Sequence, residues 1–150
     1  MRAVEASGAR VIGHVSDDPI RVEELLRAGS SADGAVTVFV GRVRDHSHGR
    51  RVIRLHYEAY GEMAERELAA ILDETASRWT FSHLEAVHRT GTLELGELSV
   101  AIVVAAPHRS TAYEASRHVI EEIKRRLPIW KREEYADGEV EWAGSAPSEA

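Results

Sequence analysis

Short runs of apolar and β-branched residues recur along the chain and predict β-strands. The run at 34–43, GAVTVFVGRV, is apolar at most positions and predicts a buried strand. The segment 83–107, HLEAVHRTGTLELGELSVAIVVAAP, predicts two strands joined through turns that contain glycine. The remaining predicted strands are ARVIGHVS (9–16), VIRLHYEAY (52–60), IWKREEY (129–135) and EVEWA (139–143).

Apolar residues at helical spacing predict two long amphipathic helices. The first covers 62–79 and the second covers 110–127, which Pro128 ends. Ser110 or Thr111 is placed to cap the second helix. The apolar stripes are Met63, Leu68, Ile71, Leu72 and Trp79 in the first helix and Ala112, Ala115, Val119, Ile120, Ile123 and Leu127 in the second.

A further helix is predicted over 17–29, DDPIRVEELLRAG, with acidic residues and proline at its start and glycine at its end. Together these elements predict an α+β fold that is mostly antiparallel and has two long helices. The length of 150 residues favours a single domain over 1–150. We expect about 1–9 and 144–150 to be flexible.

The composition narrows the class of protein. The hydrophobic fraction of 43% suffices for a core, and no apolar run is long enough to cross a membrane. The chain contains no cysteine, which excludes disulfides, thiolate metal sites and cysteine nucleophiles and fits a cytoplasmic protein. The N-terminus lacks the apolar region of a secretory signal. Because the chain has no cysteine, any sulfur chemistry must use sulfur carried by another molecule.

The charge distribution predicts a local anion site rather than a nucleic-acid interface. The net charge of −6 argues against general binding of nucleic acid. Nevertheless, 12 of the 19 basic residues fall in two segments, 41–54 and 108–132. If these two segments meet in space, they form a cationic patch in an acidic protein.

The two lysines are the strongest candidates for chemistry. Of the 19 basic residues only Lys124 and Lys131 are lysine, and they lie seven positions apart. Arginine keeps its proton in a protein, whereas a lysine that is desolvated or crowded by cations can lose it. We expect the neighbours Arg125, Arg126 and Arg132 to provide such crowding. The alternative is that an arginine-rich chain keeps two lysines close together by chance.

Two further segments offer anion-binding groups. His108 and Arg109 precede the second long helix, whose N-terminus favours a phosphate; the alternative is a solvated turn. Arg42 and Arg44 could bind an anion; the alternative is an exposed hairpin loop.

Other kinds of site are not indicated. His46 and His48 lack the carboxylate or cysteine partners of a metal site, so we predict no metal. Motifs for a nucleophilic serine, a P-loop or a dinucleotide are also missing.

Three motifs in order along the chain, VGRVRDH (40–46), APHR (106–109) and PIWKRE (128–133), carry a family resemblance. With the segments around them, from about Asp33 to Trp142, the chain resembles the large, catalytic subunits of molybdopterin synthase. The resemblance implies an α/β hammerhead-type domain with an antiparallel β subdomain. It also implies sulfur insertion into cyclic pyranopterin monophosphate to form the dithiolene of molybdopterin.

The resemblance implies partners as well. The sulfur would arrive as a thiocarboxylate on the C-terminal Gly-Gly of a ubiquitin-like small subunit. Two catalytic subunits would form the central homodimer of a heterotetramer, with no cofactor, no nucleic acid and no membrane involved. This agrees with a chain that has no cysteine.

The resemblance also implies the residues of the site. Lys124 and Lys131 would be catalytic, with Lys124 nearest to the C-terminus of the incoming small subunit. Substrate-binding roles would fall to Arg42, Val43, Arg44, His108, Arg109, Arg132 and Glu133, with His108 and Arg109 coming from the neighbouring protomer. A rival interpretation from a different class is a non-catalytic binding module that uses the same basic pocket.

Overall fold

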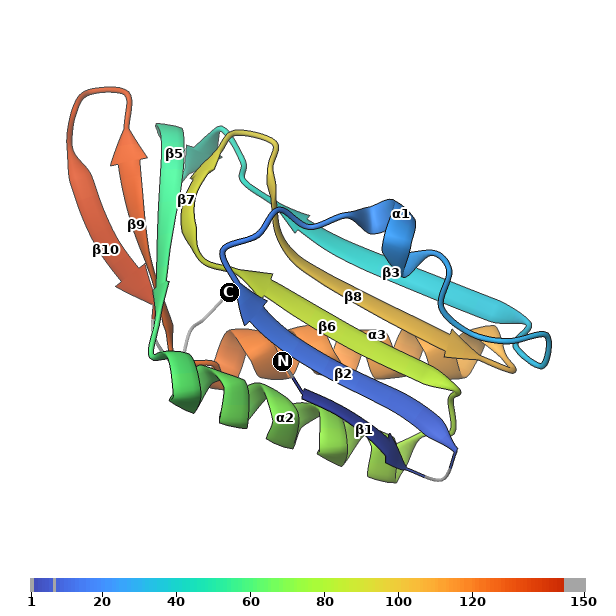
Figure 1. Ribbon diagram of the computed structural model, residues 1–150. Coiled ribbons are helices and arrows are strands. Elements are labelled where there is room, and N and C mark those ends of the chain that lie inside the picture. Colours follow the sequence, from blue (N-terminus) through green and yellow to red (C-terminus); the bar gives the residue numbers. More distant parts are fainter. Residues whose placement is uncertain (1, 7, 145–150) are drawn as a thin grey trace.

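The computed structural model of the chain describes residues 2–6 and 8–144, which form two five-stranded sheets and three helices (Figure 1). The first sheet has the order β1 (Arg2–Ala6), β2 (Ala9–Ser16), β6 (His83–Arg89), β8 (Leu98–Ala106) and β3 (Ala35–Arg42). The second has the order β10 (Val140–Gly144), β9 (Ile129–Tyr135), β5 (Arg50–Ala59) and β4 (His46–Ser47), with β7 (Gly91–Glu94) also paired to β5. All pairs are antiparallel except β2 with β6.

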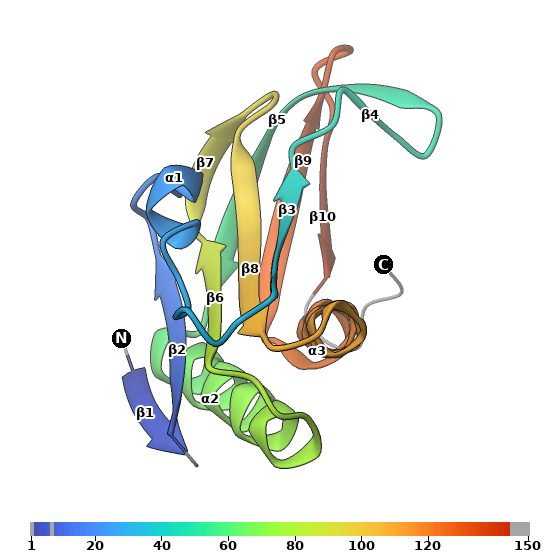
Figure 2. The same cartoon turned by 90° about the vertical axis from the view of Figure 1, so that its right-hand side faces the viewer.

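The two long helices, α2 (Gly61–Arg78) and α3 (Arg109–Arg126), cover one face of the first sheet (Figures 1 and 2). Their predicted stripes form the main core with β2, β6 and β8. Leu68 and Ile71 of α2 and Val119 of α3 are fully buried there. Burial of each such side chain is worth about 1.5–3 kcal/mol, so this layer supplies much of the stability.

The short helix α1 (Val22–Leu25) covers part of the opposite face, where Leu25 packs against Ala101 and Val103 of β8. The predicted helix over 17–29 is therefore wrong in length, because α1 has four residues. Leu25 is its only buried side chain, so no apolar stripe holds a longer helix against the sheet.

Two of the strand predictions also need correction. The strand predicted as buried is β3, an edge strand whose Val36 and Phe39 are 43% and 39% exposed, because the helices only partly cover it. The segment 83–107 forms three strands rather than two, because Gly91 and Gly96, both at positive φ, turn the chain between β6, β7 and β8. The strands β2, β5, β9 and β10 confirm the other predictions.

Smaller differences concern the helix ends and the termini. Met63 is 51% exposed and does not join the core. The helix α3 begins at Arg109 with His108 at the N-cap and no side-chain cap, so neither Ser110 nor Thr111 caps it. Residues 2–6, expected to be flexible, form β1 and pair with β2. Of the C-terminal segment expected to be flexible, 145–150 lie outside the described residues.

The junction between α3 and β9 positions the two lysines. Leu127 leaves the helical conformation with φ −70° and ψ 126°, as expected for a residue before proline, and β9 begins at Ile129. Lys124 therefore lies in the last turn of α3, and Lys131 lies on a strand of the second sheet. The chain reversal brings these two elements to one side of the molecule, where the two sheets meet (Figure 1).

Candidate active site

A pocket of about 490 Å³ lies between the two sheets and the C-terminal end of α3. Its walls come from parts of the chain that are far apart in sequence. They are the end of β3 with the loop through β4, the strands β5, β6, β8 and β9, and the last turns of α3. The lining includes Arg42, Arg44, His46, His48, Tyr57, His88, Ser99, Lys124, Lys131 and Glu133.

The two basic segments meet at this pocket, which fulfils the condition for a local anion site. Arg42 and Arg44 come from the first segment, and Lys124 and Lys131 come from the second. Within residues 8–143, none of these four side chains forms an ion pair with a carboxylate. Four unneutralised cations around one cavity form a site for an anionic ligand.

A β-bulge contributes to this arrangement. The register between β3 and β8 shifts at Gly41 and Arg42, and both residues line the pocket. A bulge re-aims the side chains that follow it. Gly41 is also required for space, because a Cβ atom there would lie 2.7 Å from Cγ1 of Val100. The bulge thus ends β3 at the point where its arginine reaches the cavity.

The electrostatics of Lys124 fit a group that can give up its proton. Burial lowers the pKa of the Lys124 amine below its ordinary value, and the charges of Lys131 and Arg44 lower it further. Lys124 as a residue remains exposed to solvent, so its amine is only partly desolvated. The two neighbouring cations therefore contribute to the lowered pKa in addition to burial. A lowered pKa increases the fraction of neutral, nucleophilic or basic amine near neutral pH.

The crowding of Lys124 has a different origin from the one that we expected. Its sequence neighbours Arg125 and Arg126 do not crowd it, because they bind acidic side chains instead. Arg125 pairs with Glu122, and Arg126 pairs with Glu122 and with Glu74 on α2. The cations that act on Lys124 are Lys131 and Arg44, which are distant in sequence or on another element.

The alternation of β9 separates its predicted site residues. Lys131 and Glu133 line the pocket, and Glu133 is 3% exposed and accepts a hydrogen bond from the Tyr135 hydroxyl at 2.9 Å. Arg132 lies on the other face of the strand, over the ring of Trp142 at 5.6 Å and 3.7 Å from Glu134. The structure therefore does not bring Arg132 into the pocket of its own chain.

Three other predicted residues also lie outside the lining. Val43 is 4% exposed and packs in the core of the second sheet. His108 and Arg109 are exposed at the N-terminal end of α3. Between Arg109 and Lys124 the helix rises by roughly 22 Å at 1.5 Å per residue, so these groups cannot share one pocket within a single chain.

The pocket includes residues that the sequence analysis did not single out. Tyr57, His88 and Ser99 line the pocket together with the cations, Tyr57 lies directly across from Lys131 in the strand register, and Phe39 adds an aromatic ring. Tyr57 and His88 lie in strands that a periodic pattern identifies only as core, so nothing in the sequence marked them. His46 and His48 also line the pocket, and His46 Nδ1 is 2.9 Å from Asp45. In the described part of the chain, three or more metal-ligating side chains nowhere converge.

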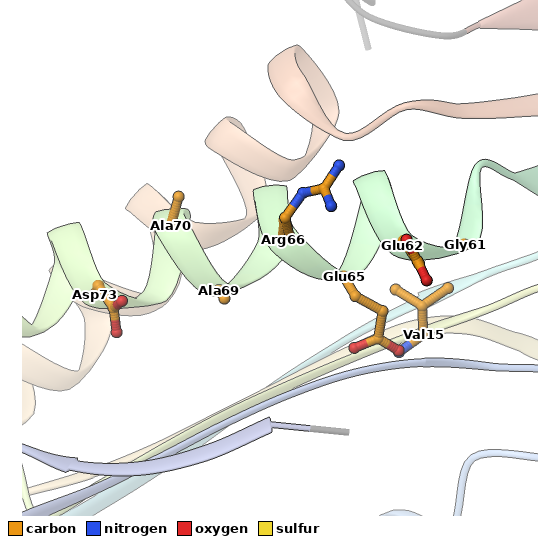
Figure 3. A pocket seen from close by; sticks show the side chains of 8 residues that line it. All are labelled: Val15, Gly61, Glu62, Glu65, Arg66, Ala69, Ala70 and Asp73. Carbon is orange, nitrogen blue, oxygen red and sulfur yellow. The ribbon is translucent and has the colours of Figure 1, made fainter.

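A second hollow lies along α2 beside Val15 of β2, and Figure 3 shows its lining. Its volume of about 950 Å³ is larger, but it is more open than the pocket between the sheets. Its lining has one cation, Arg66, and three carboxylates, those of Glu62, Glu65 and Asp73, and Figure 3 shows the guanidinium pointing away from the carboxylates. Oε1 of Glu65 accepts a hydrogen bond from the backbone of Val15 at 3.2 Å. The excess of carboxylates disfavours an anionic ligand, so the cationic pocket is the better candidate site.

The α+β fold and the cationic pocket together define a class of protein with a cavity suited to a small anionic ligand. Within the described residues, no helix is long and apolar enough to cross a membrane. Comparison with known proteins identifies the family to which the chain belongs.

The profile of the family described as MoaE protein matches residues 15–126. The molybdopterin synthase catalytic subunit of Bacillus subtilis is 42% identical over 87% of this chain and 83% of its own length. The molybdopterin synthase catalytic subunit 1 of Mycobacterium tuberculosis is 40% identical over 98% of this chain and all of its own length. The crystal structure of molybdopterin synthase from Staphylococcus aureus superposes with a TM-score of 0.80 at 40% identity, covering 87% of this chain and 96% of that one. The chain therefore belongs to the MoaE family.

Proposed function

We propose that this chain is the catalytic subunit of a molybdopterin synthase, which inserts two sulfurs into cyclic pyranopterin monophosphate to form the dithiolene. The family membership supports this activity. The observation that carries the site is the convergence on one pocket between the sheets of four cations that have no carboxylate ion pair within residues 8–143. Such a pocket suits a substrate that is small and carries a phosphate. We place the reaction in the cytoplasm.

The sulfur donor in this proposal is a ubiquitin-like small subunit that ends in a Gly-Gly thiocarboxylate. The chain has no cysteine, so it cannot carry the sulfur itself. Each thiocarboxylate holds one sulfur, so two are consumed for each dithiolene. In each transfer the thiocarboxylate sulfur forms one carbon–sulfur bond at a side-chain carbon of the pterin while a carbon–oxygen bond of that carbon breaks. Water then cleaves the acyl–sulfur bond, which leaves the sulfur on the pterin and returns the C-terminus of the small subunit to a carboxylate. The pocket would hold both reactants in position, which lowers the entropic cost of their encounter.

The two lysines have distinct roles in the proposal. Lys124, whose amine has a lowered pKa, handles the acyl end of the small subunit or moves a proton as sulfur is released. Lys131 lies across the pocket on β9 and acts as acid or base toward the pterin or binds its charge. Arg42 and Arg44 bind substrate from the mouth of the pocket, where both are exposed.

The remaining predicted contacts depend on a second protomer or act indirectly. His108 and Arg109 are too far along α3 to reach the pocket of their own chain, so we propose that they serve the pocket of the partner in a homodimer. Glu133 lines the pocket and accepts a hydrogen bond from Tyr135. Val43 supports the arginine loop from the core. Arg132 is left without a direct contact to substrate in its own chain.

A reconstituted reaction tests the proposal. The purified chain is mixed with a thiocarboxylated small subunit and cyclic pyranopterin monophosphate, and the dithiolene product is followed as its oxidised fluorescent derivative. We expect product only when both partners are present. A stable complex that yields no product with a cognate small subunit would instead support the rival function, a non-catalytic module that binds the same ligands.

A further inference from the structure

Two aromatic rings in contact with each other line the pocket, and the proposed roles above do not use them. His88, the penultimate residue of β6, is 7% exposed, and Tyr57 lies opposite it on β5. Their ring centroids are 5.3 Å apart, with the planes at 73° in an edge-to-face arrangement. Both rings line the cavity with Lys124 and Lys131. A flat heterocyclic ligand in this cavity could contact these two rings.

The hydrogen bonding of His88 defines its tautomer. Its Nδ1 atom lies 2.9 Å from the backbone carbonyl oxygen of Arg89. A carbonyl oxygen can only accept a hydrogen bond, so Nδ1 carries the proton and Nε2 keeps a free lone pair. Among the described residues, no group hydrogen-bonds to Nε2. The imidazole lines the cavity and therefore has one ring nitrogen available to accept a hydrogen bond.

The charge state of His88 strengthens this conclusion. Burial lowers the pKa of His88 to about 4, and the charge of Lys124 lowers it as well, although the bond to Arg89 opposes the shift. The imidazole is therefore neutral at physiological pH. It differs in kind from Arg42, Arg44, Lys124 and Lys131, which present hydrogen-bond donors when charged.

The two arginines are more exposed than the aromatic pair, whereas Lys124 lies close enough to His88 for its charge to act on the imidazole. Arg42 and Arg44 are exposed, whereas His88 is buried and the pKa of the Tyr57 hydroxyl is raised chiefly by burial. An anionic group on a ligand is attracted to the arginines and repelled by the lone pair of Nε2. An N–H group on a ring has the opposite preference. Glu133 also accepts hydrogen bonds here, but one of its oxygens is engaged by Tyr135.

We propose that His88 orients the substrate: its Nε2 atom accepts a hydrogen bond from a ring N–H of the pterin, whose anionic group then points toward Arg42 and Arg44. This inference rests on the proposed function and adds a specificity-determining residue to it. The ligand class that fits is a flat nitrogen heterocycle that carries a phosphate. A phosphate alone uses only the arginine end of the pocket.

The first test compares His88→Phe with the wild type in the reconstituted reaction. Phenylalanine keeps a flat ring against Tyr57 but removes both nitrogens. We expect the KM for cyclic pyranopterin monophosphate to rise about tenfold, while inhibition by inorganic phosphate stays within about twofold of wild type. His88→Gln, which retains an acceptor near the position of Nε2, is expected to recover substrate binding to within about threefold of wild type. Arg44→Gln should weaken the binding of both the substrate and phosphate.

A measurement on the unmodified protein covers the case in which His88→Phe does not fold. With 15N-labelled histidine, the Nε2 resonance of His88 should shift when substrate is added and should stay in place when inorganic phosphate is added. An unchanged resonance at saturating substrate would overturn the inference. So would an unchanged substrate KM in folded His88→Phe, or an equal loss of phosphate inhibition. In each of these cases wild-type turnover shows that the proposed function itself still stands.

Discussion

The last turn of α3 carries two cationic environments that differ in how their charges are balanced. Lys124 faces the pocket and is surrounded by the further cations Lys131 and Arg44. Arg126, two residues later and thus on another side of the helix, binds Glu67 on α2 at 2.8 Å. It also binds Glu74 and Glu122, and its pKa is raised, chiefly by the hydrogen bond to Glu74.

The comparison separates the charges around Arg126, which stabilise the fold, from the charges around Lys124, which are available to bind a ligand. The Arg126 cluster joins α2 to α3 with its carboxylates supplied by the protein, so its energy is part of folding. Among the described residues the pocket cations form no ion pair with a carboxylate, although Glu133 lines the same cavity, so a bound anion would relieve their mutual repulsion. Both clusters contribute to one run of basic residues in the sequence, and only the fold separates their functions.

The largest expected effect comes from removing amine chemistry while the charge is kept. Lys124→Arg and Lys131→Arg retain a cation at each position, but arginine does not lose its proton in a protein. We expect each variant to fold, to bind the small subunit, and to lose turnover by about 100-fold or more. Reconstituted dithiolene formation measures the turnover, and analytical size exclusion with the small subunit measures binding.

Arg125→Lys is the matched control, because it exchanges the same two residue types one position away at a side chain that binds Glu122 outside the pocket. This variant should turn over at the wild-type rate. Near-normal rates in both Lys124→Arg and Lys131→Arg would show that the pocket needs only charge, and the proposed amine chemistry would have to be abandoned.

An intermediate effect is expected from the balanced cluster. Arg126 is 22% exposed and interacts with three carboxylates, so Arg126→Ala removes the partner of Glu67 and Glu74 at the helix interface and leaves Glu122 with Arg125 alone. We expect the free energy of unfolding to fall by about 2 kcal/mol, with the KM of the folded enzyme unchanged. Urea denaturation checks the first expectation, and steady-state kinetics check the second.

Arg125→Ala serves as the comparison for that experiment, because its side chain is 62% exposed and pairs only with Glu122 along the same helix. It should leave the denaturation midpoint close to that of wild type. If Arg126→Ala were as stable as Arg125→Ala, the cluster would not hold α2 against α3, and the contrast between the two environments would disappear.

The sequence predicts much of this architecture, because the periodic patterns are strong. The stripe with Leu68 and Ile71 and the strand from Ile129 to Tyr135 both appear where the pattern places them. The errors occur where tertiary coverage decides. The apolar run of β3 is identical in kind to that of β8, and only its position at the sheet edge exposes Val36. A pattern of residues along one strand contains no information about its neighbours.

The site is predictable to a smaller extent. Lys124 and Lys131 are visible from their rarity among 19 basic residues. The lowered pKa of Lys124 comes first from burial and then from the charges of Lys131 and Arg44, and the sequence shows neither the burial nor the approach of Arg44, which is 80 positions away. His88 is missed for a related reason. Its role depends on a backbone carbonyl, a ring from another strand and an unpaired nitrogen, none of which leaves a trace in a motif.

The smallest effect is also the sharpest test of the comparison, because it has the opposite sign in the two environments. The pKa of Lys124 is lowered in the folded state, so its contribution to stability is present above the unfolded pKa of about 10.4 and is lost as the pH falls through the folded pKa. At pH 7 its charge therefore costs stability.

Lys124→Met keeps the side-chain stem, removes the charge and should stabilise the protein by about 0.5 kcal/mol, a value discounted for solvent contact. The gain should shrink as the pH approaches 10, whereas Arg126→Met should destabilise the protein at both pH values. Urea denaturation of the two variants at pH 7 and pH 10 measures this, and a loss of stability in Lys124→Met at pH 7 would show that the pocket cations are balanced after all.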